Sequence, residues 1–205
     1  MELSELVEFV KVTGETRNSE LKRSMSWEEE ETKFRITKSI MAMSNIRDGG
    51  TIILGVEEKP NRKFDPVGMN ASDIDSFNFD NMQDHVNRYA HPYTKFLVSR
   101  IPDIRPRFVV VQVEQFDEIP VICGRNYCLS TKYKMMEGEI YTRTRTKPQS
   151  TKVMNYLDLK EIIDLAIERG VKLFLERSRA AGLALGQPTG AWDEEQFSKQ
   201  IEKLL

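Results

Sequence analysis

Residues 51–56 (TIILGV) form an almost unbroken apolar run, and this run limits the possible folds more than any other part of the chain. A strand that is apolar on both sides has to be covered on both faces, so we expect it inside a sheet with helices above and below. Asp48, Gly49 and Gly50 come just before the run and indicate a sharp helix-to-strand turn that needs positive φ. Residues 107–113 (RFVVVQV) predict a second apolar strand.

Further elements are predicted around these two strands. Apolar residues at helical spacing predict helices over residues 2–11, 36–43, 72–90 and 158–180. Weaker patterns indicate strands over residues 18–24, 95–101, 119–123 and 139–143. Strands that cluster between helices, without a regular strand–helix alternation, predict an α+β fold with a mixed β-sheet flanked by helices.

The C-terminal part of the chain is expected to be a helical extension. Residues 182–190 are typical of a linker, and Trp192, Phe197 and Ile201 predict an amphipathic last helix over residues 192–205. We therefore expect one domain over residues 1–165 and the extension over residues 166–205. The last helix either packs on its own domain or docks on a protein partner.

Composition restricts the partners and the compartment. The 205 residues carry a formal net charge of −2, so nucleic acid would have to contact a local basic surface rather than the field of the whole protein. The N-terminal segment lacks the features of a signal peptide, and no apolar run is long enough for a bilayer, so we expect a soluble, cytoplasmic protein with no membrane contact. Cys123 and Cys128 are interpreted as reduced thiols, with a zinc site as the alternative.

A carboxylate and a lysine occupy alternate positions of the strand predicted over residues 18–24. Glu20 and Lys22 would therefore point to the same face. Metal-dependent nucleases use such a pair: the carboxylate binds a divalent cation, and the lysine neutralises charge that develops on the phosphate. Glu15, at the preceding turn, is a candidate second carboxylate.

A third carboxylate could come from Glu57 or Glu58, directly after the buried run, where a rigid strand opens into a loop. The alternative for all of these charges is an ordinary solvated surface.

A basic segment follows at residues 141–147 (YTRTRTK). Alternation along a strand would place Tyr141, Arg143, Arg145 and Lys147 on one face. Arg and Lys bind phosphates, and Tyr can stack on a base, so the segment is a candidate nucleic-acid contact. The alternative is a polar edge strand whose cations discourage aggregation.

Three segments together resemble the Schlafen AlbA-type domain. Residues 14–22 (GETRNSELK) are similar to the family's G-E-x4-E-[FL]-K opening. Residues 40–45 (IMAMSN) and 49–56 (GGTIILGV) are similar to its A-x-A-N-x-x-G-G-x-[IL]-x-x-G-V core, and residues 138–143 (GEIYTR) to its G-x-[IL]-Y-x-R strand. The resemblance covers roughly residues 1–165. Ser44 and Arg145 stand where the family usually has alanine and glycine.

The resemblance implies a nucleic-acid-binding domain and a metal-dependent endoribonuclease acting on structured RNA such as tRNA. It places Glu15, Glu20 and Glu58 as ligands of Mg²⁺ or Mn²⁺, with Lys22 at the phosphate. Arg17 would join the basic segment in binding nucleic acid, RNA in preference to DNA, and the single lobe implies a homodimer. The alternatives are a non-catalytic DNA- or RNA-binding module of a regulator or defence system, or a subunit of a larger assembly.

Overall fold

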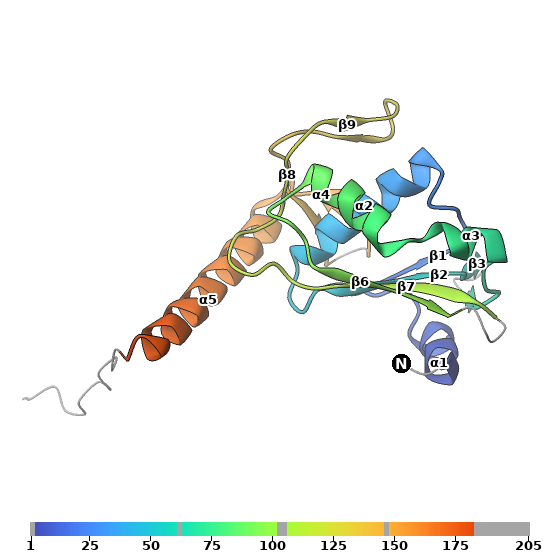
Figure 1. The fold of residues 1–205 in the computed structure, drawn as a ribbon, viewed down its shortest axis with the longest axis horizontal. Coiled ribbons are helices and arrows are strands. Elements are labelled where there is room, and N and C mark those ends of the chain that lie inside the picture. The colour runs from blue at the N-terminus through green and yellow to red at the C-terminus, as the bar shows by residue number, and fades with distance from the viewer. Residues whose placement is uncertain (1–2, 61–62, 102–105, 146–147, 183–205) are drawn as a thin grey trace, which may run out of the picture. The chain divides into compact units, whose positions relative to one another are not determined.

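A four-stranded mixed sheet forms the centre of the fold (Figure 1). The computed structural model describes residues 3–60, 63–101, 106–145 and 148–182, and it divides into two compact units, residues 1–167 and 168–205. The strand order in the sheet is β1 (Ser19–Lys22), β2 (Gly50–Leu54), β7 (Phe108–Val113) and β6 (Phe96–Ile101). β1 runs parallel to β2 and the other pairs are antiparallel, which confirms the predicted mixed sheet.

Helices cover both faces of the sheet, as the apolar run in β2 predicts. Ile52 and Leu54 belong to the core that contains α2 (Glu30–Ser44), whereas Ile53 belongs to a second core that contains Val10 of α1 (Leu3–Thr13). All three β2 side chains are fully buried. Figure 1 shows α1 on one side of the sheet and α2 on the other.

The turn between α2 and β2 has the positive φ that its sequence predicts. Asp48 and Gly49 both have φ near 65°. A Cβ atom on Gly49 would lie 2.0 Å from the carbonyl oxygen of Val113, so this position excludes a side chain. The Asp48 N–H donates a hydrogen bond of 2.9 Å to Gln115 Oε1.

The single helix predicted over residues 72–90 is wrong, because the segment forms α3 (Ala71–Ser76) and α4 (Phe79–Tyr89). Helical spacing of apolar residues continues across the break and hides it. The side chain of Asn78 accepts a hydrogen bond of 3.1 Å from the Asn81 N–H and so begins a new helix. Asn70, not Ser72 or Asp73, caps α3.

Short two-stranded pairs and one long helix complete the described part. The two-stranded pairs are β3 (Glu57–Lys59) with β4 (Lys63–Asp65), β5 (Ala90–His91) with β8 (Ile122–Cys123), β9 (Tyr127–Cys128) with β10 (Lys134–Met135), and β11 (Tyr141–Arg143) with β12 (Ser150–Lys152). The helix α5 (Tyr156–Ala180) continues through Gly170. Within the described residues, none of the helices has the length and apolar character needed to cross a membrane.

Two features predicted near the C-terminus remain predictions. Residues 183–190 of the predicted linker and the whole amphipathic helix predicted over residues 192–205 lie outside the described residues. A protein partner for that helix therefore stays a prediction.

Candidate nucleic-acid site

A polar pocket of about 640 Å³ lies beside β1 and α2. It brings together four of the side chains predicted to act in catalysis, which come from three separate segments: Glu15, Glu20, Lys22 and Glu58. Glu20 and Lys22 reach it from alternate positions of β1, and Glu58 reaches it from β3. The other lining residues are Phe34, Arg35, Lys38, Ser39, Lys132, Tyr133, Pro148, Gln149 and Ser150.

Both oxygens of the Glu20 carboxylate contact a cation. Oε1 pairs with Lys22 Nζ, and Oε2 accepts a hydrogen bond of 2.8 Å from Arg143. Burial alone would raise the pKa of Glu20, but Lys22 and Arg143 outweigh it and hold the pKa below its usual value. Glu20 is therefore an ionised, fully paired carboxylate.

The Arg143 side chain is completely buried, with 0% of its surface exposed. Besides Glu20, it donates hydrogen bonds of 2.7, 2.9 and 3.0 Å to the backbone oxygens of Arg17, Thr16 and Ser19. The guanidinium group of Arg143 is therefore bonded entirely inside the protein, where it neutralises the buried Glu20 carboxylate.

The prediction that Tyr141, Arg143 and Arg145 share one exposed basic face is therefore wrong for Tyr141 and Arg143, which are buried. Tyr141 is 2% exposed, and its hydroxyl group donates to Glu139. Both Tyr141 and Arg143 point into the protein, because β11 packs against α2 and β1 instead of forming a free edge. Lys147 lies outside the described residues.

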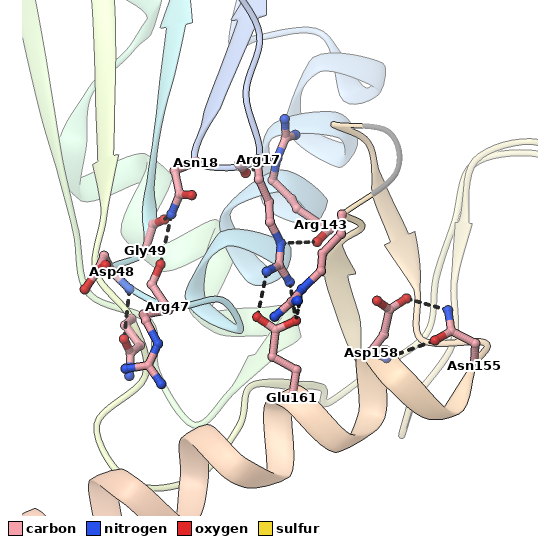
Figure 2. A network of polar contacts seen from close by, with 11 residues as sticks. Arg17, Asn18, Arg47, Asp48, Gly49, Arg143, Asn155, Asp158 and Glu161 are labelled. Carbon is pink, nitrogen blue, oxygen red and sulfur yellow. Dashed lines mark hydrogen bonds and ion pairs between the residues drawn. The ribbon is translucent and has the colours of Figure 1, made fainter.

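Glu161 of α5 holds two of the other predicted cations. Arg17 forms a bidentate pair with it at 2.6 and 2.9 Å, and Arg145 contacts it at 3.1 Å (Figure 2). Only 22% of the Arg17 side chain is exposed, whereas 72% of the Arg145 side chain is exposed. Arg145 is thus the more accessible of the two for a phosphate.

Glu15 is also engaged with the protein. Its Oε1 accepts a hydrogen bond of 3.0 Å from the Leu21 N–H, and burial, together with nearby Glu20, raises its pKa. Across the described residues, no three Asp, Glu, His or Cys side chains are grouped so that they could hold a metal ion. With Glu20 saturated by cations, this donor set does not fit a divalent cation as it stands.

Four pocket residues escaped the sequence analysis, which had considered only the apolar side of α2. Arg35 and Lys38 extend from that helix at i, i+3 spacing, and Lys132 and Tyr133 come from the connection between β9 and β10. Arg35 and Lys132 both lie 5.3 Å from the centre of the Tyr133 ring. Basic residues on the polar side of α2 were the one signal available in the sequence.

The mixed sheet, the flanking helices and the pocket at the edge strand define an α+β domain of AlbA-like type. The chain belongs to the Schlafen, AlbA_2 family, whose model matches residues 15–152. This membership confirms the resemblance seen in the sequence motifs and supports a nucleic-acid-related function.

The solved structures that are similar to this chain include the following two. One is the DIP2311 protein from Corynebacterium diphtheriae, with 14% identity and a TM-score of 0.46, over 77% of this chain and 27% of that one. The other is the N-terminal domain of an ATP-dependent DNA helicase RecG-related protein from Nitrosomonas europaea, with 16% identity and a TM-score of 0.43, over 66% of this chain and 89% of that one. This chain thus spans about a quarter of the first structure. No curated protein matches the sequence.

Proposed function

We propose that this chain is a nucleic-acid-binding domain that receives a backbone phosphate in the pocket beside β1 and α2, without a metal ion. Lys38 carries the proposal. It is half-buried in the pocket, and no ion pair of its Nζ is found within the described residues; its Nζ lies over the Tyr141 ring, 5.3 Å from the centroid. Burial lowers the pKa of Lys38, and the nearby carboxylates of Glu139 and Glu20 oppose the shift without outweighing it.

Uncharged donors in the same pocket support an anionic ligand. Ser150 Oγ is buried and has no hydrogen-bond partner in the structure, and it lines the pocket together with Lys38 and Gln149. Hydroxyl and amide groups beside lysine are common phosphate contacts. The carboxylates of Glu15 and Glu58 in the same pocket could accept a hydrogen bond from a ribose 2′-OH, which favours RNA over DNA.

The test is binding of labelled RNA and DNA by fluorescence anisotropy in EDTA. Lys38→Ala should weaken binding several-fold, and Lys11→Ala, which removes an exposed lysine of α1, should not. Equal affinities for the two variants, or no binding by the unmodified protein, would overturn the proposal.

A metal-dependent endoribonuclease is the second candidate function. The observation in its favour is that Glu15, Glu20, Lys22 and Glu58 all line one pocket. For this activity Glu20 would have to exchange its two cationic partners for Mg²⁺ or Mn²⁺ when RNA binds.

Cleavage of labelled tRNA with Mn²⁺ or EDTA separates the two candidates. Cleavage that requires Mn²⁺ and is lost in Glu58→Gln would support the nuclease, because Glu58 is exposed and its loss should leave the fold intact. Binding without cleavage under both conditions would exclude it. The predicted homodimer can be measured on the same samples by sedimentation.

A further inference from the structure

We propose that the pocket continues into a groove that binds a short single strand, with Arg35 at the centre and Arg23 at the far end. This inference rests on the proposed function and specifies the form of nucleic acid that the site takes. Its basis is that three neighbouring hollows have lining residues in common.

The hollows are contiguous. Lys22, Arg35 and Glu58 line both the pocket and a second hollow of about 420 Å³. Arg23 and Arg35 line both the second hollow and a third of about 210 Å³. Arg35 therefore borders all three, and a ligand that leaves the pocket along β1 passes its guanidinium group.

Cations follow this path at intervals. Lys38 lies in the pocket, and Arg23 lies where the second hollow meets the third. Arg35 lies at the junctions, where it pairs with Glu31 and donates a hydrogen bond of 2.6 Å to the Tyr133 hydroxyl group, so a phosphate there would compete with Glu31. Arg23 is exposed and forms no hydrogen bond or ion pair within the described part of the chain. A nucleic-acid backbone offers phosphates at regular intervals and matches such a series.

The charge reverses in the third hollow, and this limits the length of the strand. Glu29, Glu31 and Asp73 line it against only Arg23 and Arg35. Carboxylates repel phosphate, so the path ends near Arg23. The bound segment should fall at the short end of the range of about 4–16 nucleotides that is typical of single-strand sites.

The pocket walls favour unpaired bases over a duplex. Phe34 and Tyr133 line the pocket, and their rings lie 5.6 Å apart at 66°; Phe34 is buried in the core beside Tyr133, so Tyr133 is the ring that a base would contact. Aromatic rings beside a basic groove stack on bases, which is possible only when the bases are free of a helix. A duplex presents its phosphates outside and cannot place a base against Tyr133.

The experiment compares a length series of single-stranded RNA, from dinucleotide to dodecamer, with a duplex of the same sequence. Affinity for single strands should rise with length and then level off, and the duplex should bind several-fold more weakly. Arg23→Ala should weaken the longer strands and reduce the slope of log K against log salt by about 0.7, while leaving the dinucleotide unaffected. Arg100→Ala is the matched control, since this exposed arginine lies on β6 at the opposite edge of the sheet.

A second variant tests the acidic end of the path. Glu29→Lys should move the length at which affinity levels off to longer strands, because it removes the charge that repels phosphate there.

The outcomes separate this inference from the proposed function. If Lys38→Ala weakens binding but Arg23→Ala behaves like Arg100→Ala, the proposed groove is wrong, whereas phosphate binding in the pocket is supported. A duplex that binds as tightly as the single strand would also overturn the groove. If binding does not depend on Lys38, the proposed function itself fails, and the groove with it.

Discussion

Arg17 and Arg143 each donate a hydrogen bond from the guanidinium Nε to the other's backbone oxygen, at 2.8 and 2.7 Å, although 126 residues separate them in the chain. Each guanidinium group also pairs with a carboxylate: Arg17 with Glu161 (Figure 2), and Arg143 with Glu20. The start of β1, the strand β11 and the first turns of α5 are therefore joined through one reciprocal contact.

Replacement of Arg143 should destabilise the fold strongly. Arg143→Met leaves the buried Glu20 carboxylate with only one cation, and breaking a buried ion pair typically costs about 3–5 kcal/mol of unfolding free energy. Urea denaturation measures this. Arg100→Met, at an exposed arginine, should change stability by no more than about 0.5 kcal/mol. If the two variants were equally stable, the buried pair would not support the fold; adding Glu20→Gln to Arg143→Met should recover part of the loss.

Replacement of Asn45 should also lower the free energy of unfolding strongly. Its side chain donates to the Val121 and Tyr141 oxygens at 2.7 and 2.8 Å and accepts from the Val121 N–H at 2.8 Å, all in the buried interior. Asn45→Ala leaves these backbone groups unpaired, and each unpaired buried group costs about 1–3 kcal/mol. Thermal or urea unfolding should show the loss. Asn81→Ala, on the exposed side of α4, is the control that should stay close to the unmodified protein.

The free energy of unfolding should decrease as the pH is lowered, over a range of pH set by His85. Burial beside Trp27 and Tyr127 lowers the pKa of His85 to about 4, with Glu30 opposing the shift. Since the unfolded chain has a pKa near 6.5, it binds the proton first, so this contribution to stability is complete above pH 6.5 and is lost as pH falls toward 4.

The measurement is urea denaturation between pH 7 and pH 4.5. His85→Phe should flatten the dependence on pH, because His85 Nε2 has no partner to lose and a phenyl ring fits among the aromatic side chains. His91→Gln removes an exposed histidine and should keep the slope. If the free energy of unfolding of His85→Phe depended on pH as steeply as that of the unmodified protein, other titratable groups would cause the loss of stability.

Salt dependence should reveal the role of Lys38. If Lys38 neutralises one phosphate, Lys38→Ala should reduce the slope of log K against log salt for single-stranded RNA by about 0.7. Lys38→Arg should keep most of the slope, since it keeps the charge. Anisotropy titrations at several salt concentrations give both slopes. An unchanged slope in Lys38→Ala would show that this lysine does not neutralise a phosphate.

The central fold could be predicted because its signals are local. The run in β2, the positive φ near Asp48 and Gly49, and the alternation that places Glu20 and Lys22 on one face all depend on neighbouring residues. The break between α3 and α4 was missed because it depends on a side-chain cap at Asn78, which periodicity does not detect.

The site was only partly predictable because its residues meet through long-range packing. The convergence of Glu58 with Glu15 and Glu20 in one pocket agrees with the family motifs. The direction of β11 was not accessible, since alternation defines two faces but not which one is buried. Arg143 was therefore assigned to an exposed surface, although it pairs with Glu20 in the interior.

The contacts around β1 also bear on edge-to-edge association between molecules. β1 is the outer strand of its sheet, and two of its backbone groups that do not face β2 are taken by side chains: the Ser19 oxygen by Arg143 and the Leu21 N–H by Glu15. An outer strand with free backbone groups is a template for edge-to-edge pairing between molecules. Arg143 and Glu15 therefore disfavour edge-to-edge pairing at β1, and this effect does not depend on what the pocket binds.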